Sequence, residues 1–175
     1  MFKEERKETR FEWNMLGDIQ AGRPNLGTTM DVAVYRLMQF TLRDVLIQKY
    51  GVKEADEIYF MAGEHAGKEF FSNLIKEKTD FNKFVLELKE VLEKLRIGIM
   101  RIEKADLENM KFTIVIAEDL DCSGLPVTDE EICTYDEGFL SGLLRSFTGA
   151  EFDVKEVDCW CSGDRVCRFS AERKD

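Results

Sequence analysis

The five cysteines of this chain all lie in its last third. None occurs among the first 121 residues, and Cys159, Cys161 and Cys167 lie within nine residues of one another. A tight turn at Gly163 and Asp164 between two strands folds Cys167 back beside the strand that carries Cys159. Same-side positions on paired strands bring both thiols within reach of one metal ion. Converging thiols of this kind are typical of a zinc site.

Spacing alone does not complete the set of ligands. Zinc takes four tetrahedral ligands from sulfur, nitrogen or carboxylate oxygen. Cys133 lies near the start of a predicted helix, whose N-terminus favours the thiolate form. Glu156 and Cys159 have opposite strand parity, so a bulge or twist near 157–158 is required before both can face one ion. Cys161 has the same strand parity as Cys159 and could face the same ion. These residues indicate the class of metal and leave the fourth ligand open.

The cysteine pattern is also compatible with two arrangements that hold no metal. Free cysteines are often buried as small apolar side chains. A disulfide between Cys159 and Cys167 is geometrically possible across paired strands, although disulfides are rare in the cytosol. The metal site is therefore a prediction to be tested against both.

The composition is typical of one compact domain. Of the 175 residues, 44% are apolar and 13 are Phe, enough to fill a core and line a cavity. We expect an N-terminal arm over residues 1–27 and a single domain over 28–175. The formal net charge of −10 disfavours direct binding to nucleic acid. The sequence has neither a run of about 18 apolar residues nor a signal-peptide core, so we expect no membrane span and a cytoplasmic protein.

Hydrophobic periodicity predicts an α+β fold, in which an antiparallel sheet of about four strands packs against a helical layer. Gly63 and Gly67, four residues apart, lie on one helix face and allow another element to approach closely. Thr128 and Glu131 form a capping-box pattern, and Gly149 ends the helix that follows. The predicted elements are helices over 31–50, over 54–76 and from Asp80; strands over 97–102 and 112–117, joined through 103–111; a helix from 128 to about 147; and strands over 151–158 and 166–171.

The C-terminal motif resembles a known family. Residues 132–138 read Ile-Cys-Thr-Tyr-Asp-Glu-Gly, and the pattern continues with Gly142, Glu156, Cys159, Gly163, Asp164, Cys167 and Phe169. It resembles the 4-vinyl-reductase, or hydrocarbon-binding, domain family, which includes the sensory domains of phenol- and xylene-responsive activators. The family is similar in fold to vesicle-tethering-complex subunits. The resemblance covers about the last two-thirds of the chain.

The resemblance implies a particular ligand set. In the aromatic sensors zinc is held by a cysteine at a helix start, a glutamate and two further cysteines, which fall here on Cys133, Glu156, Cys159 and Cys167. Cys161 and Cys122 lie outside this pattern, and either stays open as a replacement for Glu156. The arm resembles the segment that contributes to dimer contacts in those sensors, which implies a homodimer.

The resemblance also implies a small-molecule pocket between the sheet and the helices. The candidate lining residues are Phe81, Phe84, Phe112, Ile114 and Ile116. Phe84 and Phe112 lie near the positions where the phenol sensors place a histidine and an indole nitrogen. The expected ligand is therefore a hydrophobic or aromatic molecule rather than a phenol.

We therefore expect a zinc-containing small-molecule sensor domain without catalysis of its own, which passes any output to a protein partner. The alternatives are a reductase of tetrapyrrole metabolism and a scaffold subunit of a larger assembly. The sequence lacks a Gly-x-Gly-x-x-Gly fingerprint, which disfavours a nucleotide-dependent reductase. Four protein ligands also leave zinc no open position for catalysis.

Overall fold

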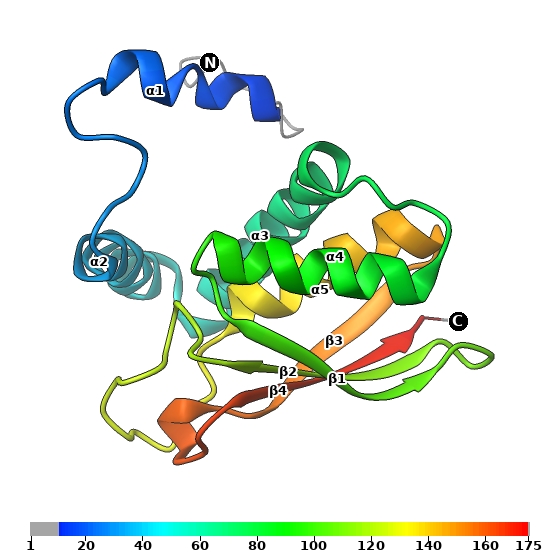
Figure 1. Cartoon of the computed structure of the whole chain (residues 1–175). Helices are drawn as coiled ribbons and strands as arrows, with labels where there is room; N and C mark the ends of the chain where they lie inside the picture. The colour runs from blue at the N-terminus through cyan, green and yellow to red at the C-terminus, as the bar shows by residue number, and fades with distance from the viewer. Residues whose placement is uncertain (1–10, 175) are drawn as a thin grey trace.

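The computed structural model describes residues 11–174. Two short helical segments, η1 (Trp13–Leu16) and α1 (Ile19–Gly22), come first. The remaining elements are α2 (Val32–Tyr50), α3 (Val52–Leu74), α4 (Phe81–Lys94), β1 (Ile99–Asp106), β2 (Lys111–Ala117), α5 (Thr134–Thr148), β3 (Phe152–Asp158), η2 (Trp160–Ser162) and β4 (Cys167–Arg173). Helices α4 and α5 cover one face of the sheet, and α3 lies on α5 (Figure 1). The predicted α+β class with a four-stranded antiparallel sheet is confirmed.

The sheet has the strand order β1-β2-β4-β3, and every neighbouring pair is antiparallel. Buried residues alternate along β3 and β4, which places their apolar side chains against the helices. In the central pair, Cys167 lies opposite Ile116. The register of β3 on β4 shifts between Glu156 and Asp158. This is the predicted bulge, and it removes the parity conflict between Glu156 and Cys159.

Helices α3 and α5 approach closely because glycines face each other across their contact. A Cβ atom on Gly63 or Gly67 would collide with the backbone carbonyl of Tyr135 or Phe139. Two glycines of α5 are equally constrained by backbone atoms of α3. The close approach predicted for Gly63 and Gly67 is confirmed, and its partner is α5, the helix whose first turn adjoins the cysteines.

Helix α5 begins at Thr134, six residues after the predicted start. The backbone amides of Thr128 and Asp129 donate to the carbonyl of Cys161, at 2.9 and 3.0 Å, so the segment is held by the loop after β3. Asp129 also has a φ of 57°, which interrupts helical geometry. The capping-box prediction was therefore wrong, and Cys133 occupies the N-cap position instead. Gly149 ends the helix in the left-handed conformation, as predicted.

The hairpin between β1 and β2 is tighter than the pattern predicted. Strand β1 continues to Asp106, well into the expected connection. The turn is closed by the Asp106 carboxylate, which accepts from the backbone amide of Asn109 at 3.0 Å. The connection thus spans residues 107–110 only.

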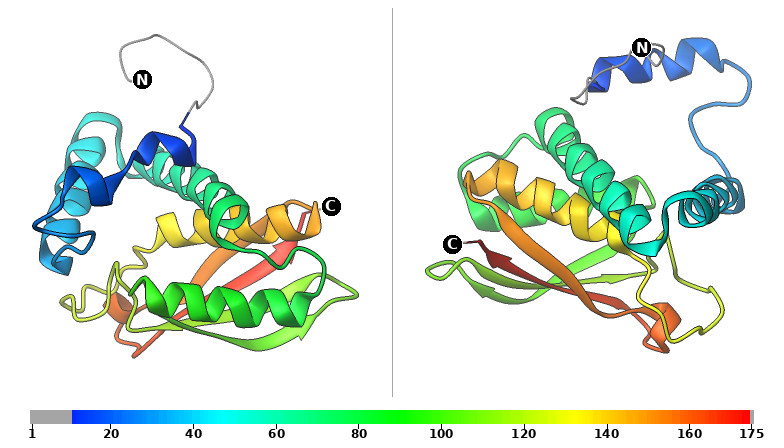
Figure 2. Two further views of the ribbon diagram at one scale, coloured as in Figure 1. Left: turned by 45° about the horizontal axis from the view of Figure 1, so that its top comes forward. Right: turned by 180° about the vertical axis from the view of Figure 1, so that it is seen from behind.

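Helix α2 has an unusual distribution of polarity. Its half-buried side combines the polar residues Tyr35, Arg36, Gln39 and Arg43 with the apolar residues Phe40, Leu46 and Ile47. Apolar side chains on the opposite side are exposed, namely Val34, Leu37, Met38, Leu42 and Val45. Figure 2 shows α2 at the edge of the molecule, joined to α1 by an extended connection. The helix thus packs through both polar and apolar side chains and presents an apolar stripe outward.

Residues 1–10 of the predicted arm lie outside the described residues, and the rest of the arm contains the short helices η1 and α1. Within residues 11–174, no helix is both long and apolar enough to cross a bilayer.

Candidate metal centre and apolar cavities

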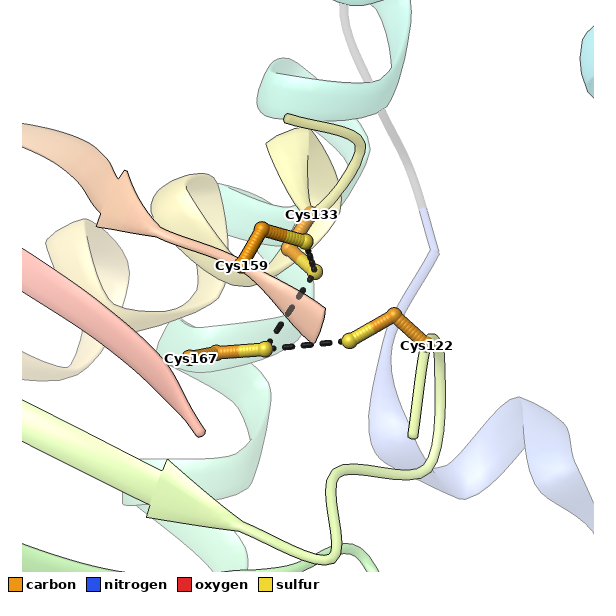
Figure 3. A group of neighbouring side chains, drawn as sticks. All are labelled: Cys122, Cys133, Cys159 and Cys167. Atoms are coloured by element: carbon orange, nitrogen blue, oxygen red, sulfur yellow. Dashed lines mark hydrogen bonds between the residues drawn. The ribbon is translucent and has the colours of Figure 1, made fainter. Parts of the chain in front are cut away.

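Four cysteine thiols converge at one end of the sheet (Figure 3). The sulfur atoms of Cys122, Cys133, Cys159 and Cys167 all lie within 4.8 Å of one another. The Cys133 sulfur is 3.8 Å from that of Cys159 and 3.8 Å from that of Cys167. The Cys122 and Cys167 sulfurs are 3.0 Å apart. The structure thus brings together three of the predicted ligands with Cys122, which the family pattern does not include.

Each thiol comes from a different structural position. Cys122 lies in the loop after β2, and Cys133 is the N-cap of α5. Cys159 directly follows β3, and Cys167 is the first residue of β4. The hairpin turn is closed by Gly163 with a φ of 100°, a conformation that favours glycine. A single ion at this position would join the last hairpin to the helix and to the loop.

Two of the sulfur separations fit a tetrahedral ion, whereas the separation of 3.0 Å between Cys122 and Cys167 is shorter. Two thiolates bound to zinc at about 2.3 Å, at the tetrahedral angle, are separated by about 3.8 Å. Two of the sulfur pairs have this separation. All four cysteines are free thiols and are at most 1% exposed. The donor set therefore suits a closed, structural zinc site.

The thiols perturb one another strongly. Hydrogen bonds from the Cys122, Cys133 and Cys167 thiols lower the pKa of Cys159. Hydrogen bonds with Cys122, Cys159 and Cys167, together with burial, raise the pKa of Cys133. The group therefore accommodates one thiolate readily and opposes further loss of protons. A divalent cation bound here would supply the positive charge that all four thiols need to ionise.

Glu156, the fourth predicted ligand, lies beside the thiols and is 4% exposed. Its Oε2 accepts a hydrogen bond from the backbone amide of Cys133 at 3.1 Å. Its Oε1 has no hydrogen-bond partner among the described residues. Burial and the neighbouring Cys159 raise its pKa to about 8. Among the described residues, Glu156 belongs to no group of three or more side chains whose ligand atoms all lie within 4.8 Å of one another.

Cys161 is buried but lies outside the group of four sulfurs. Burial raises the pKa of its thiol to about 12. Its backbone carbonyl accepts from the amides of Thr128 and Asp129 and so holds the segment before α5. The position of Cys161 therefore suits a structural thiol.

Three buried aspartates surround the cysteines, and none of them was predicted from the sequence. Asp119, Asp121 and Asp136 are 3%, 4% and 8% exposed. Burial and the charge of Asp121 raise the pKa of Asp119 to about 7. Asp121 accepts hydrogen bonds from Tyr35 and Gln39 of α2. The sequence Asp-Leu-Asp-Cys at 119–122 could have indicated them, because it places acidic and thiol side chains on one short loop.

Four of the five predicted pocket residues line one cavity between α4, α5 and the sheet. They are Phe81, Phe84, Phe112 and Ile114. Ile116 is buried further along β2, opposite Cys167, and does not line it. Every other residue around the cavity is also apolar, including Leu88, Met100 and Leu143. Its volume is about 10 Å³, because the rings of Phe81 and Phe112 stack at 5.2 Å and those of Phe84 and Phe147 at 4.5 Å.

A second cavity, of about 400 Å³, lies between the arm, α3 and α5. It is lined mainly by apolar side chains, among them Trp13, Phe70 and Phe139, with Tyr35 and Asp136 also present. This cavity was not predicted from the sequence, because its wall includes η1, which was expected to be irregular.

A family model and a sequence relative match this chain. Residues 112–173 match the model of the 4-vinyl-reductase domain. The protein MJ1642 of Methanocaldococcus jannaschii, described as uncharacterised, is 28% identical over 151 residues. That alignment covers 86% of this chain and 82% of the relative.

Three solved structures share the fold at low sequence identity. The phenol-responsive sensory domain of the transcription activator PoxR, with phenol, has a TM-score of 0.65 at 12% identity and covers 84% of this chain and 76% of its own. A vinyl-4-reductase family protein from Methanocaldococcus jannaschii has a TM-score of 0.64 at 19% identity, with coverages of 96% and 100%. The trafficking protein particle complex subunit 3 from Naegleria fowleri, covalently bound to palmitic acid, has a TM-score of 0.64 at 12% identity, with coverages of 82% and 95%.

The matched residues 112–173 span most of β2, helix α5 and the hairpin of β3 and β4. Cys133, Cys159 and Cys167 all lie within them. The resemblance to the 4-vinyl-reductase domain family that the C-terminal motif predicted is confirmed, and residues 112–173 are the part of the chain that matches the model of this domain.

Proposed function

We propose that this chain is a zinc-containing sensor domain that binds a small hydrophobic or aromatic molecule and has no catalytic activity of its own. The observation that carries the metal part is the separation of the buried sulfurs, 3.8 Å for two pairs, which matches tetrahedral thiolates on zinc. The zinc has a structural role here, because burial and saturation with protein ligands leave no position for substrate or water.

Elemental analysis tests the zinc. We expect one zinc ion per chain in protein purified without chelator, and loss of that ion in Cys159→Ser. Cys161→Ser is the matched control, because Cys161 is also a buried thiol of the same loop but lies outside the group of four sulfurs. Protein without stoichiometric zinc, or equal zinc in Cys159→Ser and the parent, would contradict the proposal.

The proposed ligand site is the aromatic cavity between α4, α5 and the sheet. Its support is the wholly apolar lining and the similarity in fold to a phenol sensory domain and to a subunit bound to palmitic acid. An apolar lining offers burial and dispersion but no partner for a hydroxyl group. Because the cavity measures about 10 Å³, binding requires the stacked rings to move apart. Phe81 and Phe147, one ring of each stacked pair, are only partly buried and are the rings that can move most readily.

Calorimetry with toluene and phenol tests this site and its preference. Toluene is expected to bind more tightly than phenol, since the phenol hydroxyl would lose its hydrogen bonds to water on burial. Phe84→Ala enlarges the cavity and is expected to strengthen toluene binding. Leu86→Ala, at an exposed position of the same helix, is the control and should leave binding unchanged. Binding that is insensitive to Phe84→Ala would place the ligand elsewhere, with the cavity of about 400 Å³ as the first alternative.

We also propose that the protein is a homodimer whose contact includes α2, and that its output passes to a protein partner. The support is the exposed stripe of apolar side chains on α2, since a contiguous apolar surface of this kind is typical of an interaction site. A cytoplasmic location is proposed as well, because five free thiols persist most readily in a reducing compartment.

A further inference from the structure

We infer that Cys122, and not Glu156, supplies the fourth metal ligand, and that the metal thereby holds the loop to which α2 is attached. This inference rests on the proposed zinc site and adds two things to it: the identity of the fourth donor, and the part of the molecule that the metal controls. The residues that carry it are Cys122, its neighbour Asp121, and Arg36 of α2.

The positions of the donor atoms favour Cys122. Its sulfur lies within 4.8 Å of the other three sulfurs, whereas Glu156 completes no such group among the described residues. The Glu156 carboxylate already has another role, because its Oε2 accepts from the backbone amide of Cys133 at the N-terminus of α5. In the inferred arrangement Glu156 positions Cys133 through Oε2, its Oε1 keeps no hydrogen-bond partner among the described residues, and Cys122 completes a set of four thiolates.

The loop that carries Cys122 is shaped by Asp119. The Asp119 carboxylate accepts from the backbone amides of Asp121 and Cys122, at 2.8 and 3.1 Å. This tight turn sends the two consecutive side chains in different directions. The Cys122 thiol reaches the other sulfurs (Figure 3), whereas the Asp121 carboxylate reaches α2.

Helix α2 contacts this loop through several polar groups. The Tyr35 hydroxyl and the Gln39 amide donate to Asp121, at 2.8 and 2.6 Å. The Arg36 guanidinium donates to the carbonyls of Leu120, Ser123 and Asp119, at 2.8, 2.9 and 3.3 Å. No residue of α2 is fully buried. These hydrogen bonds join the helix to the loop, and they stand beside its contacts with α3, which include the ion pair between Arg43 and Asp56.

The consequence is a coupling between the metal and α2. When Cys122 is bound to the ion, the backbone carbonyls and the Asp121 carboxylate are held where α2 needs them. When the ion leaves, Cys122 is no longer held and the loop can move. Helix α2 then detaches from the loop before the strands of the sheet separate. The metal thus controls the position of the helix that carries the exposed apolar stripe.

Cobalt substitution tests the donor. The intensity of sulfur-to-cobalt charge-transfer absorption rises with the number of bound thiolates. In Cys122→Ser this intensity should fall by the share of one thiolate out of four. Glu156→Gln and Cys161→Ser should keep the intensity of the parent protein. A parental spectrum in Cys122→Ser together with a changed spectrum in Glu156→Gln would overturn the inference while leaving the metal site itself intact. Absence of cobalt and zinc binding in the parent protein would instead remove the proposed metal site.

Hydrogen exchange tests the coupling, first in the unmodified protein and then in Cys122→Ser. We expect graded chelation to accelerate exchange of residues 32–50 and 118–123 before it affects β1 and β2. Cys122→Ser with metal still bound by the other three thiolates should show the same fast exchange in residues 32–50 while α5 stays protected. Exchange in α2 that does not respond to metal, or that accelerates only together with the whole sheet, would overturn the coupling.

Discussion

The sulfur atoms of Cys122 and Cys167 lie 3.0 Å apart, although 45 positions separate them in the sequence. The pairing of β2 with β4 explains this, because Cys167 lies opposite Ile116 near the end of β2. The chain leaves β2 directly into the loop that carries Cys122. The register of two central strands therefore determines which thiols meet.

Removal of the metal should lower the stability of the fold. The ion joins segments that are distant in the sequence, and a ligand present at 100 times its Kd stabilises the folded state by about 2.7 kcal/mol. We expect the melting temperature to fall on treatment with chelator and to recover when zinc is added back. Because protons compete with the metal for thiolates, the stabilisation should also decrease as the pH falls. Equal melting temperatures with and without chelator would contradict this prediction.

Gly67→Ala should weaken the packing of α3 on α5. The added Cβ would collide with the backbone carbonyl of Phe139, and overpacking of this kind costs about 1–3 kcal/mol. Chemical denaturation measures the change in the free energy of unfolding. Gly22→Ala is the control, because a Cβ at that position meets no atom within 4 Å. If Gly67→Ala loses no more free energy of unfolding than Gly22→Ala, α3 and α5 can move apart without loss of stability, which contradicts the prediction.

Glu77→Gln should alter the pH dependence of stability. Hydrogen bonds from the backbone amides of Asp80 and Thr79, and from the Thr79 hydroxyl, lower the pKa of Glu77 from 4.5 to about 2. A lowered carboxyl pKa stabilises the folded state above pH 4.5, and this contribution is lost as the pH falls towards about 2. The parent protein should therefore be more stable than the variant near neutral pH, and the difference should disappear in acid.

Urea denaturation at several pH values measures this difference. Glu93→Gln, at an exposed position near the end of α4, controls for the general loss of one negative charge. A difference between Glu77→Gln and the parent that stays constant down to pH 2 would show that the hydrogen bonds of Glu77 are not the cause.

Leu37→Glu should convert the proposed dimer into a monomer. Leu37 is 66% exposed on the apolar stripe of α2, so a second copy would bury it, and a charge buried without a partner is strongly unfavourable. Light scattering coupled to size exclusion should show the mass of the parent halved in the variant. Leu86→Glu, at an exposed position of α4, should leave the mass unchanged. A parent protein with the mass of one chain would contradict the dimer.

Features that depend on local geometry followed from the sequence. The parity of strand residues required a bulge between Glu156 and Cys159, and the register shift lies there. Asp80 caps α4 by accepting from the backbone amide of Lys83, at 3.1 Å, as its position before an apolar stripe predicted. Gly63 and Gly67 marked a close helix contact because residues four apart share one face of a helix.

Features that depend on distant partners were decided by the tertiary structure alone. Thr128 does not cap a helix, because Asp129 after it has a φ of 57° and the carbonyl of Cys161, beyond β3, holds the amides of both residues. The residue spacing left the fourth ligand open and the resemblance pointed to Glu156, since the direction of the Cys122 side chain depends on the Asp119 turn and on Arg36 of α2. The sequence by itself thus determined that thiols gather near the C-terminus. The tertiary structure decided which of them meet, because convergence depends on strand register and loop anchoring rather than on spacing along the chain.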